Sequence, residues 1–186
     1  NEGRLILRFS DLGHPSNELQ IAGKISLLIP EPDIFQVNKW YHVAFTYDAV
    51  TGIAAIYVNG EKVTDKNVGN QTFDLNERFC IGYAYDYDPY RTWPGYMSEC
   101  RLWTVARTAN QLRGNMMGVD PESEGLLGYW KLNGTDYEER DGKFYVKDQT
   151  KNGLDALSRM GMRGEPGFPE GGSVKPDVVD MKVKIE

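Results

Sequence analysis

The sequence predicts an all-β sandwich, and three of its features support that prediction. Many short segments are rich in strand-forming residues and are bounded by Gly, Pro, Asn or Asp. Several of these segments alternate apolar and polar residues with a period of two. Only one segment has the pattern of a helix, and it is short. Frequent turns around short strands are typical of a sandwich rather than of a mixed α/β fold.

The first half of the chain contains the clearest strand patterns. Residues 4–10 (RLILRFS) and 18–23 (ELQIAG) are short and flanked by turn-forming residues. The later stretch IAAIYVNGEKV contains Asn59-Gly60, which predicts a type I′ hairpin because both turn positions need a positive φ. Between them, KWYHVAFTYD alternates with a period of two, and one set of its residues is predicted to face the core: Tyr41, Val43, Phe45 and Tyr47.

The second half predicts further strands and the one helix. RFCIGYA, YMSECRLWT, LLGYWKL and KFYVKD have strand patterns, and Thr108 is a suitable N-cap for a short helix over ANQLRGNMM. From Gly161 the chain is rich in Gly and Pro, and it ends in the alternating segment VVDMKVKIE. We therefore expect one domain over residues 1–160, with 161–186 as an irregular wrap and a last strand packed on that domain.

Composition excludes several classes of protein. A chain of 186 residues can bury a core, and its net charge of -6 argues against nucleic acid or anionic membranes as partners. No apolar run approaches the length of a transmembrane helix. Cys80 and Cys100 are too few for a disulfide-stapled scaffold. They form either one disulfide or two buried thiols, and we favour the thiols because free cysteine behaves as a small apolar residue.

Four motifs in order resemble a known family. KWYHVAFTYDAVTGIAAIYVNGE is similar to the signature of laminin-G and pentraxin domains. CIGYA, GYMSECRLWTVARTANQL and GLLGYWKLNG with VKDQTKNG resemble the later blocks of bacterial laminin-G-like domains, so the resemblance covers about residues 4–157. It implies the concanavalin A-like jelly-roll sandwich, a fold whose modules commonly bind carbohydrate. The variant looks most like those of surface or periplasmic proteins of Bacteroides-type bacteria, which implies a secreted, periplasmic or outer-surface location.

The resemblance also implies that something is missing. Domains of this family usually begin with two or three strands before the equivalent of RLILRF, and this chain has none there. Its first residue is Asn rather than Met, so we expect a piece of a longer protein. The sheet edges left open would need cover, for which the C-terminal segment VVDMKVKIE is one candidate.

The stretch YAYDYDPYRTWPGY, residues 83–96, is the candidate binding segment. It holds five tyrosines and one tryptophan, interrupted by Pro, Gly and Asp so that no regular element can run through it. Tyr83 and Tyr96 flank strands and are predicted to pack inward. An aromatic ring can cover the apolar face of a sugar while Asp and Arg bind its hydroxyls. The predicted carbohydrate-binding residues are Tyr85, Asp86, Tyr87, Asp88, Tyr90, Arg91 and Trp93.

Catalysis is not expected. Glucanases on this fold carry the pattern Glu-x-Asp-x-x-Glu, whose two carboxyl groups hydrolyse the glycosidic bond. The nearest stretch here is EPDIFQ, with Glu31, Asp33 and then Gln36 in place of the second glutamate. Because an amide cannot deliver a proton, the sequence predicts a protein that is not an enzyme.

Calcium is the one cofactor that the resemblance suggests. Asn17 and Asp86 match ligand positions of pentraxin-like domains, and Asp88 could add a third oxygen donor. The flanking ligand positions do not match, and calcium takes six to eight oxygens. Asp148 is expected to anchor its own turn with Asn152 rather than to bind a metal.

These observations predict a non-catalytic carbohydrate-binding module of a larger secreted or cell-surface protein. Its partner would be a glycan or a cell-surface polysaccharide. The alternative is a protein-interaction or architectural laminin-G-like domain without a glycan ligand, since Tyr and Trp are also enriched in protein interfaces. An exposed ring beside Asp or Arg in a groove would favour a sugar, whereas a flatter apolar patch would favour a protein.

Overall fold

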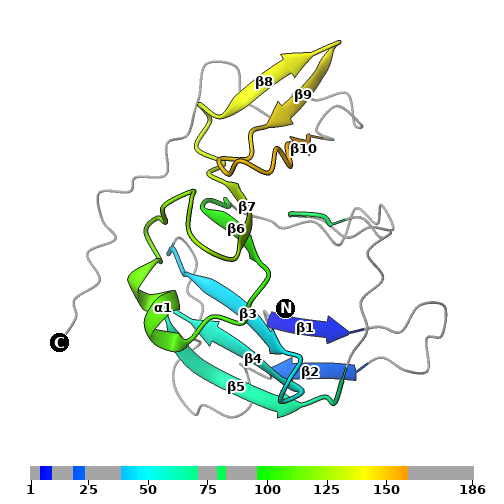
Figure 1. Ribbon diagram of the computed structural model, residues 1–186, viewed down its shortest axis with the longest axis vertical. Helices are drawn as coiled ribbons and strands as arrows, with labels where there is room; N and C mark the ends of the chain where they lie inside the picture. The colour runs from blue at the N-terminus through cyan, green and yellow to red at the C-terminus, as the bar shows by residue number, and fades with distance from the viewer. Residues whose placement is uncertain (1–4, 10–18, 24–38, 71–78, 83–95, 159–186) are drawn as a thin grey trace. The chain divides into compact units, whose positions relative to one another are not determined.

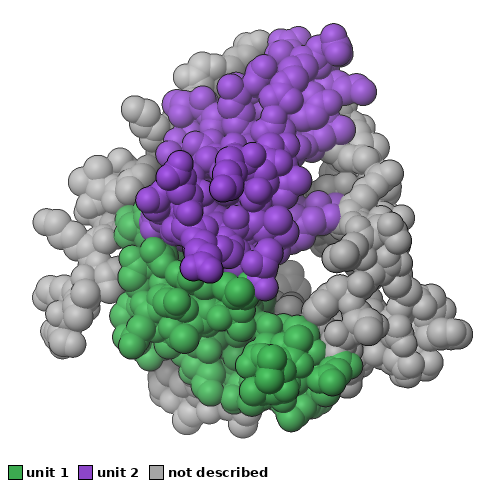
Figure 2. All heavy atoms as spheres, viewed as in Figure 1, with its two compact units in different colours: residues 1–77, 105–117 green, residues 78–104, 118–186 purple. Residues whose placement is uncertain are grey.

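The computed structural model describes residues 5–9, 19–23, 39–70, 79–82 and 96–158 (Figure 1). The chain forms two compact units (Figure 2). Unit 1 comprises residues 1–77 and 105–117, and unit 2 comprises residues 78–104 and 118–186. The predicted boundary at residue 160 and the predicted C-terminal strand lie outside the described residues.

Unit 1 is built from antiparallel strands and one short helix. Strand β1 (Leu5–Phe9) pairs with β2 (Leu19–Gly23), which lies beside β5. Strands β3 (Val43–Asp48), β4 (Ile53–Val58) and β5 (Glu61–Asn67) form a three-stranded sheet in which β4 is central (Figure 1). These five strands confirm the strand predictions for the first half of the chain.

The central strand β4 carries the core of the described sheet. Ala54, Ile56 and Val58 on one of its faces are 0%, 0% and 7% exposed. Phe45 on β3 lies directly opposite Ile56, so the predicted core-facing set of β3 shares this face. None of that set is fully buried, however, and Phe45 remains 43% exposed.

The predicted hairpin and helix are both present in unit 1. Asn59 and Gly60 have φ values of 51° and 77°, the positive values that a type I′ turn requires. A Cβ atom at Gly60 would lie 2.9 Å from the Cβ of Arg113, so only glycine fits there. Helix α1 (Ala109–Gly114) begins after Thr108, which forms a capping box with Gln111.

Unit 2 contains two further antiparallel sheets. Strand β6 (Cys100–Trp103) pairs with β7 (Leu126–Trp130), and β8 (Tyr137–Arg140), β9 (Lys143–Val146) and β10 (Ala156–Leu157) form a sheet in the order β10-β9-β8. The sequence predicted β6, β7 and β9 but not β8 or β10. Among the described residues of this unit, four hydrophobic side chains are buried: Leu126, Tyr129, Trp130 and Val146.

Residues 79–82 and the two cysteines test two local predictions for unit 2. The strand expected over RFCIGYA is wrong for its described part, because residues 79–82 are irregular and Gly82 has a φ of 82°, outside the range of a strand. Cys80 and Cys100 are free thiols, as favoured, but both are only partly buried. Burial raises the pKa of the Cys100 thiol to about 11, so this side chain is unreactive at neutral pH.

Candidate functional site

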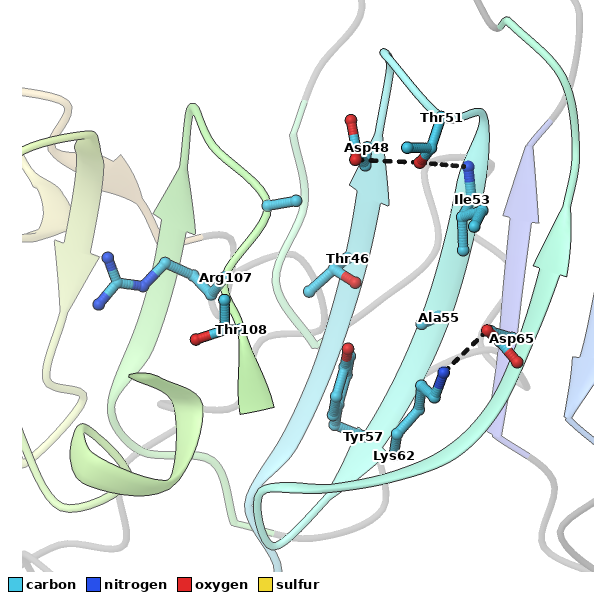
Figure 3. A pocket seen from close by; sticks show the side chains of 11 residues that line it. Thr46, Asp48, Thr51, Ile53, Ala55, Tyr57, Lys62, Asp65, Arg107 and Thr108 are labelled. Carbon is cyan, nitrogen blue, oxygen red and sulfur yellow. Dashed lines mark hydrogen bonds and ion pairs between the residues drawn. The ribbon is translucent and has the colours of Figure 1, made fainter. Parts of the chain in front are cut away.

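An open hollow of about 340 Å³ lies on the sheet of unit 1 (Figure 3). Ile53, Ala55 and Tyr57 of β4 line it; they alternate with Ala54, Ile56 and Val58 and therefore face the opposite side of the sheet. Strands β3 and β5 and the segment 106–108 supply the rest of the lining: Thr46, Asp48, Thr51, Lys62, Asp65, Ala106, Arg107 and Thr108.

A β-bulge brings two charged residues of β5 to the same side of this hollow. Tyr57 lies opposite Lys62, but its neighbour Ile56 lies opposite Thr64, so Val63 has no partner in the ladder. The extra residue reverses the alternation of β5. Lys62 and Asp65, three positions apart, consequently face the same way, and Lys62 Nζ forms an ion pair with Asp65 Oδ2 at 2.9 Å (Figure 3).

Asp48 at one end of the hollow is held by its own turn. Asp48 Oδ1 accepts a hydrogen bond from the Val50 N–H and Oδ2 accepts one from the Thr51 hydroxyl, each 2.9 Å long. The hydrogen bond from Val50, followed by the one from Thr51, holds the pKa of Asp48 below its usual value. The carboxylate is therefore ionised at neutral pH, and each of its oxygens already accepts one hydrogen bond.

Unlike the Asp48 carboxylate, two hydroxyl groups of the hollow make no hydrogen bond to a described residue. Neither Thr46 Oγ1 nor Tyr57 Oη has a hydrogen-bond partner among the described residues, and both line the hollow in Figure 3. The guanidinium of Arg107 points away from the strands and donates to Asn115 Oδ1 at 2.9 Å (Figure 3). The hollow thus offers two hydroxyls with spare hydrogen-bonding capacity.

A second polar cluster lies in unit 2, at the start of β6. Glu99 has a φ of 57°, an uncommon conformation for a residue with a side chain. Its carboxylate forms an ion pair with Arg101, whose side chain is 6% exposed, and accepts a hydrogen bond of 2.6 Å from Tyr129 Oη. Burial, together with the Glu99 hydrogen bond, raises the pKa of Tyr129 to about 12. This cluster fixes the chain three residues after the aromatic segment ends.

The aromatic segment itself is described only at its two ends. All seven predicted carbohydrate-binding residues lie within 83–95, outside the described residues. Before the segment, Phe79 stacks on Trp130 with ring centroids 5.9 Å apart. A Cβ atom at Gly82 would lie 3.3 Å from Met97 Sδ, so the two ends of the segment approach each other.

Residue Tyr96, at the end of this segment, is 64% exposed, and its predicted inward packing is therefore wrong. The physical reason is that residues 96–99 form no strand, so strand alternation does not orient the ring. Phe79 is 60% exposed as well. Two partly open aromatic rings consequently flank the segment.

The other predicted site residues lie outside the described part of the chain. Asn17, together with Glu31, Asp33 and Gln36, lies outside the described residues. Within the described ranges, no group of three or more His, Cys, Asp or Glu side chains could hold a metal ion.

Asp148 anchors its own turn, as the sequence predicted. Its carboxylate accepts hydrogen bonds from the N–H groups of Tyr129, Thr150 and Leu154 and from the Thr150 hydroxyl, at 2.7–3.0 Å. Asn152 secures the same turn by donating to the Leu127 carbonyl at 2.9 Å. The cluster has a structural role.

The sequence did not single out the hollow of unit 1. Its residues occupy the solvent-facing positions of ordinary amphipathic strands, which carry no distinctive motif. The one usable signal was the spacing of Lys62 and Asp65 after a tight turn. In a regular strand this spacing would place the two side chains on opposite faces, and only the bulge at Val63 brings them to the same face.

Comparison with known proteins gives the family and one informative relative. A family model described as the concanavalin A-like lectin/glucanases superfamily matches residues 2–113. A crystal structure from Bacteroides ovatus, described as a "putative carbohydrate binding protein", is 38% identical over 82% of this chain, with a TM-score of 0.60. The match spans 40% of that protein's length.

Other comparisons add little. An S-layer domain-containing protein from Clostridium thermocellum is 20% identical, covers 60% of this chain and 51% of its own, and has a TM-score of 0.39, too low to support an argument. No curated protein matches the chain. In the part of the chain that the structure describes, no helix is long and apolar enough to cross a membrane.

The family model covers more than half of the chain, and its class agrees with the antiparallel strands and the one short helix of the structure. The prediction of an all-β fold of the jelly-roll sandwich type is confirmed. The chain belongs to the concanavalin A-like lectin/glucanase superfamily, in its laminin-G-like branch.

Proposed function

We propose that this chain is a non-catalytic carbohydrate-binding module. The observation that supports this most is its 38% identity, over 82% of the chain, to the Bacteroides ovatus protein described as carbohydrate binding. A hollow lined by hydroxyls, carboxylates and one ammonium group is compatible with that role, because such groups recognise the hydroxyls of a sugar.

The aromatic segment 83–96 is the proposed contact surface. Its rings would stack on the apolar faces of sugar residues while its Asp and Arg side chains bind hydroxyls. Phe79 before the segment and Tyr96 at its end are 60% and 64% exposed, which is compatible with this role. The proposed binding residues are Tyr85, Asp86, Tyr87, Asp88, Tyr90, Arg91 and Trp93.

The module is proposed to lack hydrolytic activity. Retaining and inverting glycosidases need two carboxyl groups across the scissile bond, one of them protonated. The stretch nearest to the glucanase motif, EPDIFQ, has Gln36 in place of the second glutamate. We therefore propose binding without turnover.

Calcium is an optional part of the proposal. Asn17, Asp86 and Asp88 provide one amide oxygen and two carboxylates, which are the donor types that calcium prefers. They fall short of six to eight ligands, so backbone carbonyls or the glycan itself would have to supply the others. If bound, the ion would orient sugar hydroxyls at the segment 83–96.

The module is proposed to work inside a larger secreted or surface-exposed protein. The match to the Bacteroides ovatus protein spans only 40% of that protein's length, which leaves room for other domains in a protein of that type. A weakly binding module would gain from this arrangement, since a second binding domain on the same chain raises the overall avidity.

A glycan array tests the proposal. The full chain is compared with its Tyr87→Ala, Trp93→Ala double variant, in calcium and in a chelator. Phe144→Ala is the control, because Phe144 is a 49% exposed aromatic residue on β9. We expect a glycan signal that the double variant loses and the control keeps. A glycan signal that depends on calcium would support Asn17 and Asp86 as calcium ligands in the binding site.

The opposite result would favour the rival function. If the folded wild-type chain binds no glycan under either condition, the exposed rings at the segment are better explained as a protein-binding surface. Truncation of an aromatic anchor at a protein interface lowers the binding free energy by several kcal/mol. Capture of a protein partner by the wild type but not by the double variant would therefore establish that alternative.

A further inference from the structure

We propose that the hollow on the β3-β4-β5 sheet is a second saccharide site, which holds one neutral sugar residue and does not use the segment 83–96. The inference rests on the proposed function for the class of ligand. The proposed second site lies in unit 1, whereas the aromatic segment belongs to unit 2.

The hydrogen-bonding state of the hollow is the first argument. Thr46 Oγ1 and Tyr57 Oη have no partner among the described residues, although the side chains around them are paired. A hydroxyl can both donate and accept a hydrogen bond. Two such groups on adjacent strands match the hydroxyls of a sugar ring, which also donate and accept.

The charged side chains of the hollow are compatible with a neutral ligand. Lys62 and Asp65 neutralise each other at 2.9 Å, and the Asp48 carboxylate is taken by Val50 and Thr51. The Asp48 carboxylate keeps its negative charge, which disfavours an anionic ligand, and a cationic ligand would have to compete with Lys62 for Asp65. A neutral sugar can instead add hydrogen bonds to Lys62 and Asp65, whose side chains are 49% and 42% exposed, while their ion pair stays intact.

The hollow is large enough to hold one sugar ring. Ile53, which is 39% exposed, provides an apolar surface for the C–H face of a ring, whereas Ala55 beside it is buried. The volume of about 340 Å³ is at the lower end of known ligand sites, which start near roughly 300 Å³. A site of this size, open on one side, binds weakly, so the test must detect weak binding.

The experiment is an NMR titration of the full-length chain, uniformly labelled with ¹⁵N. The probes are glucose, galactose, mannose and N-acetylglucosamine, each added as the free sugar. We expect one of them to shift the amide signals of Thr46, Ala55, Tyr57 and Lys62 in a saturable way.

A double variant tests the two hydroxyls directly. Thr46→Val, Tyr57→Phe removes both and should weaken binding at the hollow about tenfold, since each neutral hydrogen bond is worth a few-fold in affinity. Thr64→Val, Tyr145→Phe is the matched control, because it makes the same chemical change at two residues that do not line the hollow. The control should bind as the wild type does.

Because the readout is resolved by residue, this inference and the proposed function can fail separately. Sugar-dependent shifts confined to residues 79–99 would overturn the second site and support the proposed function. Shifts at the hollow that persist unchanged in the Thr46→Val, Tyr57→Phe variant would also overturn it. No shift at the hollow with any probe overturns the second site, and a blank glycan array in addition would count against carbohydrate binding as a whole.

Discussion

The turn around Asp148 and the hollow beside Thr46 are both rich in polar groups, yet their hydrogen bonding is opposite. The Asp148 carboxylate accepts four hydrogen bonds from its own chain. In the hollow, the Thr46 and Tyr57 hydroxyls have no partner within the described residues. A satisfied cluster stabilises the fold, whereas hydroxyls with spare capacity can bind a ligand. Composition alone does not distinguish the two.

The largest expected effect is the loss of the satisfied cluster. Asp148→Ala leaves the N–H groups of Tyr129, Thr150 and Leu154 without their acceptor, and we expect it to lower the free energy of unfolding by about 3 kcal/mol. Chemical denaturation measures this. Glu124→Ala, which removes an exposed carboxylate, is the control and should change stability little. A small effect of Asp148→Ala would show that this cluster is not structural.

The same cluster predicts a pH dependence. Burial would raise the pKa of Asp148, but its hydrogen bonds from Thr150, Tyr129 and Leu154 outweigh burial and lower the pKa below 3.8. A carboxyl group whose pKa is lower in the folded state stabilises the fold above its unfolded pKa, and this contribution is lost as pH falls through the folded value. We therefore expect stability to decline below about pH 4. The stability of Asp148→Asn should decline less steeply with falling pH than that of the wild type. An equal decline in both proteins would mean that other acidic residues cause it.

A smaller effect is expected at the cluster beside the aromatic segment. Tyr129→Phe removes the 2.6 Å hydrogen bond to Glu99 but leaves the ion pair with Arg101. We expect a loss of about 1.5 kcal/mol in unfolding free energy, since one bond to a charged acceptor disappears. Tyr145→Phe, in the same unit, is the control. Equal stability of the two variants would mean that the hydrogen bond from Tyr129 to Glu99 makes no net contribution to the free energy of unfolding.

The smallest effect on stability is expected in the hollow. Thr46→Val and Tyr57→Phe remove hydroxyls that bond to no other described residue, so each should change the free energy of unfolding by less than about 0.5 kcal/mol. Thermal denaturation of the unliganded chain measures this. A loss comparable to that of Tyr129→Phe would show that the hydroxyls serve the fold rather than a ligand.

Much of the fold could be predicted because it depends on local patterns. Asn59-Gly60 specifies its turn through backbone conformation, and Thr108 specifies the start of α1 through its capping box. Strand β8 was missed because YEER is short and charged. Asp141-Gly142, with φ values of 52° and 71°, was a hairpin signal that could have revealed it.

The sites were harder to predict because they depend on contacts that the sequence does not show. The aromatic composition of 83–96 identified a candidate surface, but the exposure of Tyr96 followed from irregular backbone rather than from strand alternation. Lys62 and Asp65 meet only because of the bulge at Val63. No local pattern reveals which hydroxyls remain without a partner, since that depends on the folded neighbours.

Equilibrium binding of the folded wild-type chain to immobilised glycans tests the central claim most directly. We expect binding to at least one neutral glycan, with competition by the corresponding free sugar. A folded chain that binds no glycan, with or without calcium, would contradict the account of this protein as a carbohydrate-binding module.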